Sequence, residues 1–385
     1  MKLLAAISAA CCAVSLLYYL VSTVIGIRLA RRASSPPGSL PKIVPRVAVL
    51  KPLHGSDGNL PENLVSYLEL DYSKIEFILG VASYDDEAAA VAVGLKPQYP
   101  FRQITLAVGE EPGCCNGKVA KLIGMAERAP RAEIFLVSDA DVTVDRDHLK
   151  RVVSELEADP QVGVVTCLYR ARASGTLASR LGALFVNTDF VPLVMVSNLV
   201  EPMRYTLGAT AAIKRNALEA MGGFGRLKDL LADDYYLGKF ASDCGFKIGL
   251  SSSIVTIRSE EQNFASFWKH KLRWFRTYRT TRPISLATIV LHGPFWASLL
   301  VIAARCSMFA LTAFAAVYLA RMITSWLMIG KVLGLRDQRG DALLAPLKDL
   351  VMTAIWVAGL FSNEVLWHGR RLRIQSDGTM QEVLR

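Results

Sequence analysis

The feature that most constrains this chain is an apolar run near the N-terminus that contains no charged residue. The run covers residues 3–27, and about 20 residues suffice for a helix to cross a bilayer. A buried core helix is the alternative, but a charge-free stretch of this length is more typical of a membrane span. A cleavable signal peptide would have a shorter apolar core. We therefore predict an uncleaved N-terminal membrane anchor over residues 1–32.

Positive charges beside this run predict its orientation. Arg28, Arg31 and Arg32 follow the run directly, and positive residues favour the cytoplasmic side of a membrane. We therefore expect residues 33–283 to form a cytoplasmic domain. The whole chain has a net charge of +10, 52% hydrophobic residues and 20% charged residues. Such a composition argues against disorder, and it favours membrane association over nucleic-acid binding.

A second apolar region covers residues 284–363. It divides into segments at 284–304, 307–329 and 343–361. Three full crossings would place the basic tail at 364–385 outside, against the positive-inside tendency. The first segment is interrupted by His292-Gly293-Pro294. We therefore predict two full crossings, with the first segment lying in the interface or re-entering the membrane.

The residues between these regions alternate between predicted strands and helices. Strands are expected at 47–50, 76–81, 103–108, 133–137 and 162–166, and helices at 61–70, 86–95, 118–128, 147–158 and 233–242. Alternation of this kind indicates an α/β fold with a largely parallel sheet. Ligands of such sheets bind beyond the carboxyl ends of the strands.

Acidic residues follow two of these strands. Asp85 and Asp86 come after the strand at 76–81, and Asp139 and Asp141 come after the strand at 133–137. The two groups are therefore expected at one edge of the sheet. The chain contains neither G-x-G-x-x-G nor G-x-x-x-x-G-K-[ST], so the usual dinucleotide-binding and P-loop folds lose their main support.

The spacing Asp139-x-Asp141 suits a divalent cation. Mg²⁺ and Mn²⁺ prefer oxygen ligands, and substrate phosphates commonly complete their coordination shell. A calcium loop is rejected because Val144 holds the place of the required glycine and Lys150 that of the final glutamate. Carboxylates that cap a helix are the alternative to a metal site.

A third acidic pair, Asp233-Asp234, lies at the start of a predicted helix. Helix capping is again the alternative. The pair is preceded by the flexible turn at 222–225 and followed by His270-Lys271-Leu272-Arg273-Trp274. A glycine-rich turn at 222–225 would let the backbone approach a ligand.

In this order, the motifs resemble those of lipid-directed glycosyltransferases of the GT-A fold, and more narrowly the ceramide glucosyltransferase family, glycosyltransferase family 21. The motifs that carry the resemblance are Lys51-Pro52-Leu53-His54-Gly55, Glu69-Leu70-Asp71-Tyr72, Asn116-Gly117-Lys118, Gly208-Ala209-Thr210 and Asp233-Asp234-Tyr235. The bacterial hopanoid-associated branch is the most similar, through residues 166–170, 179–185 and 272–274 with 282–283. A terminal motif that begins with His270, where the family usually has Gln or Arg, is also similar to that branch.

The resemblance implies a GT-A domain between N-terminal and C-terminal transmembrane helices. It implies a multi-pass enzyme of the bacterial inner membrane that moves a sugar from a UDP-sugar to a lipid hydroxyl with inversion. N-acetylglucosamine transfer to a hopanoid of the bacteriohopanetetrol type is the first expectation, and glucose transfer to ceramide is the alternative. A polysaccharide synthase and a non-catalytic membrane scaffold are the lesser alternatives.

The resemblance also implies roles for individual residues. Asp234 would be the general base, Arg273 would stabilise the diphosphate and Trp274 would form an apolar wall near the acceptor. His270 would contact the diphosphate, with a surface helix histidine as its alternative. The donor would be bound by Asp85, Asp86, Lys118 and Asp139, and a divalent metal, Mg²⁺ or Mn²⁺, by Asp139 and Asp141.

Basic and aromatic side chains interleave at about 262–283. Nucleic-acid binding is one interpretation, since such residues can pair with phosphates and bases. A helix in the membrane interface is favoured, because this segment leads directly into an apolar one. We predict that the bilayer, and no nucleic acid, is the partner of this helix.

Overall fold

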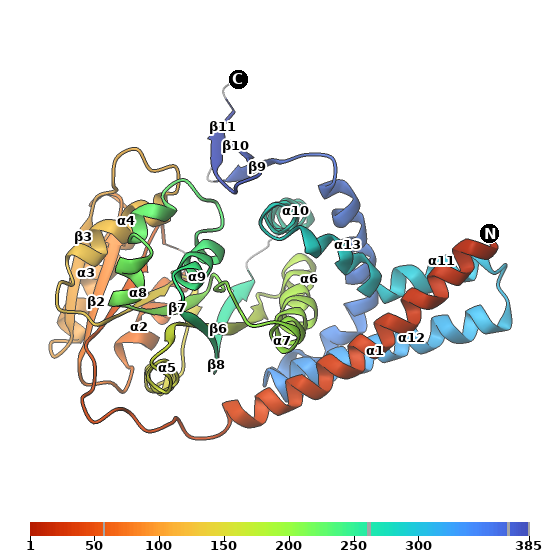
Figure 1. Cartoon of the computed structure of the whole chain (residues 1–385), viewed down its shortest axis with the longest axis horizontal. Coiled ribbons are helices and arrows are strands. Elements are labelled where there is room, and N and C mark those ends of the chain that lie inside the picture. The colour runs from red at the N-terminus through yellow and green to blue at the C-terminus, as the bar shows by residue number, and fades with distance from the viewer. Residues whose placement is uncertain (57, 260–262, 368–369, 384–385) are drawn as a thin grey trace. The chain divides into compact units, whose positions relative to one another are not determined.

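The computed structural model describes residues 1–56, 58–259, 263–367 and 370–383 (Figure 1). The chain forms two compact units. The sheet unit comprises Ser35–Tyr169 and Pro202–Ile257, and the helical unit comprises Met1–Ser34, Arg170–Glu201 and Arg258–Arg385. The sequence-based prediction placed residues 170–201 and 258–283 in the catalytic domain, whereas the contacts group them with the apolar helices.

The sheet unit is built on an eight-stranded sheet with the order β3-β2-β1-β4-β7-β6-β8-β5. Its strands are β1 (Val47–Pro52), β2 (Ile75–Val81), β3 (Gln103–Val108), β4 (Ile134–Ser138), β5 (Val142–Thr143), β6 (Val162–Ala173), β7 (Thr210–Lys214) and β8 (Lys247–Ser259). The strands β3, β2, β1 and β4 run parallel. The β4–β7, β6–β7 and β5–β8 pairs are antiparallel. The sheet is therefore mixed, and the expectation of a largely parallel sheet holds for one half only.

Helices connect the parallel strands, as the alternating pattern predicted. They are α2 (Leu60–Leu68), α3 (Glu87–Leu95) and α4 (Gly117–Glu127), with the short η1 (Lys96–Gln98) after α3, while α5 (His148–Glu157) leads from β5 to β6. Every residue of β1 is buried, as expected for a central strand covered on both faces. The remaining helices of this unit are α8 (Arg215–Ala220), η3 (Phe224–Leu227) and α9 (Asp233–Asp243). Strands β5, β7 and β8 were not predicted. β5 has only two residues, and β7 and β8 pair with antiparallel partners that are distant in the sequence.

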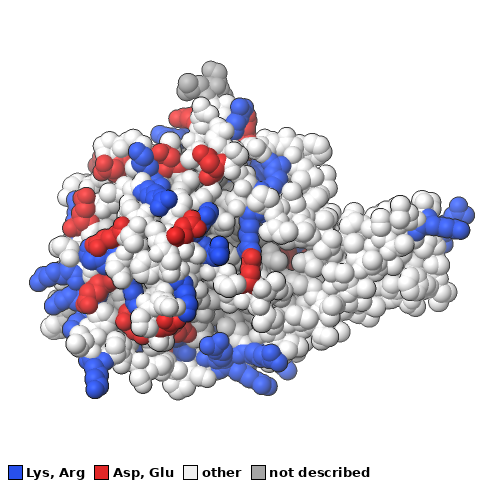
Figure 2. Space-filling model, viewed as in Figure 1, with Lys and Arg blue, Asp and Glu red and all other residues white. Residues whose placement is uncertain are grey.

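The helical unit contains long apolar helices. Its helices are α1 (Lys2–Ala33), α6 (Leu177–Phe185), η2 (Val186–Phe190), α7 (Val191–Val200), α10 (Phe264–Thr281), η4 (Pro283–Leu291), α11 (Gly293–Ala303), α12 (Met308–Leu327), η5 (Met328–Val332), η6 (Arg336–Leu344) and α13 (Ala345–Gly359). Helices α1, α11 and α12 pack around a buried cluster that includes Cys12, Leu300 and Val317. Figure 2 shows that the surface over these three helices carries few charged side chains along most of its length.

Four helical stretches in the described part of the chain are long and apolar enough to cross a membrane: Lys2–Ala33, Leu177–Val200, Met308–Val332 and Arg336–Gly359. The pair Pro283–Leu291 and Gly293–Ala303 bends by 57° at the predicted Gly-Pro break, as a broken span or a re-entrant loop would. The predicted N-terminal and C-terminal apolar helices are thus present, and they indicate a membrane protein. The stretch Leu177–Val200 was not foreseen.

The segment predicted as an interfacial helix forms α10. Asn263 and Ser266 close a reciprocal capping box at its start, and position 262 lies outside the described residues. The predicted basic tail contains the strands β9 (Glu364–Trp367), β10 (Arg370–Ile374) and β11 (Met380–Glu382) of a small antiparallel sheet. Positions 368, 369, 384 and 385 of that tail also lie outside the described residues.

Candidate active site

The carboxyl ends of three parallel strands form one edge of the sheet. Strand β1 pairs with β2 on one side and with β4 on the other. Asp85 and Asp86 follow β2, and Asp139 follows β4 directly. The two acidic groups predicted to share an edge are therefore separated by a single strand.

A buried lysine of the neighbouring strand holds the backbone of the loop that carries Asp139 and Asp141. Lys51, at 0% exposure in β1, donates to the carbonyl oxygens of Asp139 at 2.8 Å and of Val142 at 3.4 Å. Burial lowers the pKa of Lys51 to about 7. Asn63 holds the same loop by donating to the carbonyl of Ala140 at 3.1 Å. Both side chains fix the backbone and leave the carboxylates of the loop to other partners.

Lys118 joins the loop to the start of α9. Its Nζ lies 2.7 Å from Oδ1 of Asp139 and 3.2 Å from Oδ2 of Asp233. Burial by itself would lower the pKa of Lys118, but the two facing carboxylates raise it above its usual value. Asn116 caps α4 and also donates to Oδ1 of Asp233 at 3.2 Å. The motif at 116–118 thus places one ammonium group between two carboxylates.

Asp234 lies beside this cluster, in the first turn of α9. Its Oδ1 accepts from the backbone N–H of Tyr235 at 2.8 Å. The other carboxylate oxygen, Oδ2, faces Gly208. A Cβ at position 208 would lie 3.0 Å from Oδ2 of Asp234 and 4.0 Å from Oδ2 of Asp139, so glycine leaves space for both carboxylates. Burial and the neighbouring Asp233 raise the pKa of Asp234 to about 7. A carboxylate with such a pKa can accept a proton near neutral pH.

The two residues after β2 differ from each other. Asp86 is the N-cap of α3, where Oδ1 accepts from the backbone N–H of Ala88 at 3.0 Å and of Gly55 at 2.9 Å. His54 lies 3.4 Å from Oδ2 of Asp86. Asp85 is exposed in the preceding turn. Asp86 therefore caps α3 and at the same time ties the β1 loop to that helix.

The other predicted site residues lie in the helical unit, on α10. The ring of His270 packs edge-on against Trp274 at 5.2 Å between centroids. Trp274 also contacts Phe185 and Phe190 at 5.9 and 6.2 Å. Arg273 belongs to the same helix. Lys118, Asp139, Asp233 and Asp234 thus converge within the sheet unit, while His270, Arg273 and Trp274 form a separate group on one helix.

Asp139 and Asp141 would not complete the coordination shell of a divalent ion by themselves, so substrate phosphates and water would have to supply the other ligands. Within the described residues, no three His, Cys, Asp or Glu side chains are grouped so as to hold an ion. Mg²⁺ usually takes one or two carboxylates and completes its shell with water and substrate phosphates. Asp139 and Asp141 therefore match the protein's share of such a site.

Four residues that shape this site were not predicted to have a role in it: Lys51, Asn63, Asn116 and Asp233. A lysine inside an otherwise apolar strand is a signal that could have identified Lys51, since a buried charge needs partners. Asn116 and Asp233 belonged to motifs that carried the resemblance, but their contact is a matter of tertiary structure. Nothing in the local sequence distinguishes Asn63.

A mixed sheet with an Asp-x-Asp loop at the end of its parallel half is the architecture of a GT-A glycosyltransferase. The solved mannosyltransferase from Pyrobaculum calidifontis, in complex with GDP-Man and Mn²⁺, has the same fold. The match has a TM-score of 0.54 and 22% identity, and it covers 93% of this chain and 99% of that one. At this identity the likeness concerns the fold alone.

The chain belongs to glycosyl transferase family 21, whose model matches residues 7–380. Ceramide glucosyltransferase 3 of Caenorhabditis elegans is 26% identical over 233 residues, which are 60% of this chain and 50% of that protein. A poly-beta-1,6-N-acetyl-D-glucosamine synthase of Staphylococcus epidermidis is 19% identical over 228 residues, 59% of this chain and 53% of that protein. The chain thus spans about half the length of the curated relatives it matches.

Proposed function

We propose that the protein is a membrane-bound glycosyltransferase that moves a sugar from a UDP-sugar to a lipid hydroxyl with inversion at the sugar. The observation that carries the proposal is the convergence of Asp139, Lys118 and Asp234 beyond the ends of the parallel strands. Membership of family 21 supports the reaction class, and the long apolar helices support a lipid acceptor. An inactive scaffold would have no need of this arrangement.

The proposed roles follow from the chemistry of each group. Asp234 removes the proton of the acceptor hydroxyl as that oxygen attacks the anomeric carbon. Lys118 keeps a positive charge where the donor diphosphate binds, because Asp139 and Asp233 hold its ammonium in place. Asp85 and Asp86 bind the uridine end of the donor. We assign His270 and Arg273 to the diphosphate and Trp274 to the acceptor, and α10 to the membrane interface.

Asp139 and Asp141 are the residues that would hold Mg²⁺ or Mn²⁺, and the bound ion would neutralise charge on the leaving diphosphate. Lys51 and Asn63 keep the backbone of this loop in place. The domain order that we propose is an anchor at 1–32, a cytoplasmic catalytic domain at 33–283 and membrane segments at 284–363, in the inner membrane of a bacterium.

The finer proposal is transfer of N-acetylglucosamine to a hopanoid, supported by the motifs at 166–170, 179–185 and 272–274. Transfer of glucose to ceramide is the second candidate. It draws support from the similarity to ceramide glucosyltransferases of Caenorhabditis elegans. The two candidates differ in both donor and acceptor, so one assay separates them.

The test uses membranes that contain the full chain, labelled UDP-N-acetylglucosamine or UDP-glucose, and bacteriohopanetetrol or ceramide. We expect labelled lipid from one donor–acceptor pair, loss of product with EDTA, and recovery on adding Mg²⁺ or Mn²⁺. Product that persists in EDTA would contradict the metal site at Asp139 and Asp141. Absence of lipid product with every pair, from membranes that contain folded protein, would contradict the proposed function.

The rate of transfer is expected to rise with pH and to level off above about 7. The base must be unprotonated, and burial together with Asp233 raises the pKa of Asp234 to about 7. Replacing Asp233 with Asn removes the like charge, so the midpoint should move to lower pH. Initial rates between pH 5.5 and 9 measure both midpoints. An unshifted midpoint in Asp233→Asn would exclude this electrostatic coupling.

A further inference from the structure

A cavity of about 130 Å³ lies inside the helical unit. Its lining residues come from α1, α6, η2, α7, α10, η4, α12 and α13, together with His292 between η4 and α11. Most of these elements belong to the candidate membrane spans or to the bent pair. An engineered cavity of about 150 Å³ accepts benzene, so this cavity has room for a ring or a short chain segment of a larger molecule.

The walls of the cavity are mainly apolar. The apolar lining includes Phe185, Phe190, Leu193, Phe275, Met352 and Trp356. The ammonium group of Lys271 also lines the cavity, but it lies over aromatic rings, 4.8 Å from the centroid of Trp274 and 5.3 Å from that of Phe185. The ring faces stabilise that cation within the protein. Such walls suit the hydrocarbon part of a lipid.

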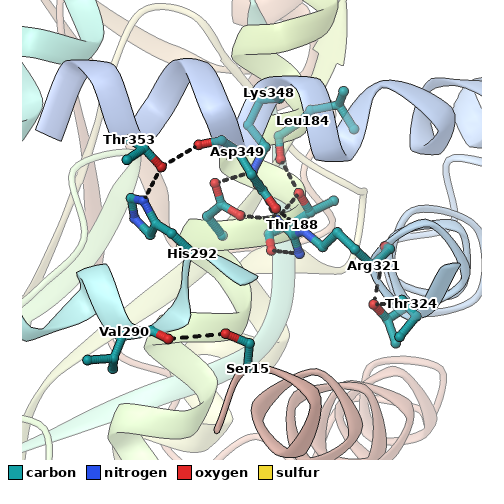
Figure 3. A network of polar contacts seen from close by, with 12 residues as sticks. Ser15, Leu184, Thr188, Val290, His292, Arg321, Thr324, Lys348, Asp349 and Thr353 are labelled. Atoms are coloured by element: carbon teal, nitrogen blue, oxygen red, sulfur yellow. Dashed lines mark hydrogen bonds and ion pairs between the residues drawn. The ribbon is translucent and has the colours of Figure 1, made fainter. Parts of the chain in front are cut away.

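One end of the cavity is polar and charge-balanced. Asp189, Arg321, Lys348 and Asp349 form a four-charge cluster with two carboxylates and two cations (Figure 3). Arg321 donates to Asp349 through Nε at 2.7 Å and to the carbonyl of Thr188 at 3.0 Å. Because the cluster is neutral in sum, it offers no net charge to a charged ligand. Ionisable residues within apolar helices are costly and commonly functional.

Asp189 is the member of the cluster that is most open to the cavity. Its side chain is 29% exposed, whereas those of Lys348 and Asp349 are 0% and 7% exposed. It lies on the π-helical turn η2, and single π-turns within helices are frequent at functional sites. His292 also lines this end and shares a hydrogen bond of 2.7 Å with Thr353 (Figure 3).

Three further polar atoms on the cavity wall are buried and make no hydrogen bond among the described residues. They are Oη of Tyr19, Oγ of Ser285 and Nε1 of Trp356, which can only donate. A buried donor without an acceptor is costly, so native proteins rarely keep one without a reason. A ligand that carries oxygen atoms would supply hydrogen-bond acceptors for Trp356 and Ser285.

We propose that this cavity binds the hydroxyl-bearing part of an uncharged membrane lipid. The lipid oxygen accepts from Trp356 and Ser285, a lipid hydroxyl donates to Asp189, and the adjoining hydrocarbon packs against the aromatic walls. The inference goes beyond the proposed function, because lipid binding in this cavity does not require sugar transfer. The carboxylate of Asp189, the most exposed side chain of the cluster, favours a hydroxyl over a phosphate.

The test measures lipid binding by the full chain in phosphatidylcholine nanodiscs, with no sugar donor present. Three radiolabelled probes are used: N-hexanoyl-sphingosine, its 1-phosphate, in which a charged phosphate replaces one hydroxyl, and bacteriohopanetetrol. We expect at least one uncharged probe to bind, and the 1-phosphate to bind more weakly than N-hexanoyl-sphingosine. Trp356→Phe and Ser285→Ala should each weaken binding of that uncharged probe about 2- to 10-fold, the value of one hydrogen bond.

Trp326→Phe is the matched control, since Trp326 is 42% exposed on α12 and does not line the cavity. It should bind like the wild type. Melting temperatures identify any variant that fails to fold. If Trp356→Phe does not fold, the binding measured with Ser285→Ala, the smaller change, decides the test. Wild-type affinity in the folded cavity variants, tighter binding of the phosphate, or no binding of either uncharged probe would overturn the inference. Absence of sugar transfer by a chain that binds the probe would instead contradict the proposed function and leave the cavity site intact.

Discussion

Asp234→Asn is expected to lower the rate of sugar transfer about 10²- to 10⁴-fold, which is the usual contribution of a positioned general base. The amide has nearly the shape of the carboxylate, and its oxygen can still accept the hydrogen bond from the N–H of Tyr235. It cannot take the proton of the acceptor hydroxyl. Binding of the UDP-sugar should therefore persist, as equilibrium binding of labelled donor to the variant would show.

Asp243→Asn is the matched control for this variant. Asp243 ends the same helix, is exposed and pairs with Lys239 at 2.7 Å. Exposed pairs of this spacing contribute only about 0.3–0.5 kcal/mol, so the control should transfer sugar at the wild-type rate. Normal turnover by Asp234→Asn would remove Asp234 from the role of base. Equal losses in both variants would point to damage to α9.

Arg321→Met is expected to destabilise the helical unit by about 3–5 kcal/mol, the cost of removing one partner from a buried ion pair. Arg321 is 4% exposed and contacts both Asp189 and Asp349. Its loss leaves two carboxylates facing Lys348 as their remaining cation within the cluster. Thermal unfolding of the full chain in detergent measures the effect, and Arg305→Met, at an exposed arginine, is the control.

A second substitution tests whether charge balance is the cause. In the double variant Asp189→Asn with Arg321→Met, Lys348 faces Asp349 alone, so the cluster is again neutral. The double variant should therefore melt at a higher temperature than the sum of the two single changes predicts. Simple additivity, or an Arg321→Met protein as stable as Arg305→Met, would contradict the importance of the four-charge cluster.

Local patterns were sufficient to predict much of this protein. The charge-free run at 3–27 became α1, and the alternating pattern placed β1 to β4 and their helices within a few residues. Asp139, Lys118 and Asp234 were chosen from motifs, and the structure brings them together in the sheet unit. Their catalytic roles stay predictions until they are measured.

Features that depend on distant partners were missed. The candidate span Leu177–Val200 contains Asp189, and a charged residue within the stretch led to its prediction as part of a soluble domain. The charge is tolerated because Arg321 and Lys348 reach it from 132 and 159 residues further along the chain. Similarly, Asn63 supports the Asp139 loop by donating to a carbonyl that lies 77 residues further along the chain. No local pattern records such pairings.

The four-charge cluster also bears on how the protein is made. Translation proceeds from the N-terminus, so Asp189 emerges from the ribosome before either of its cationic partners. At about 5–20 residues per second, the 132 residues up to Arg321 require roughly 7 to 26 s. During that interval the carboxylate of Asp189 lacks both cations of the finished cluster. Neutralisation of Asp189 within the candidate span Leu177–Val200 is therefore a late event, completed when α12 and α13 arrive.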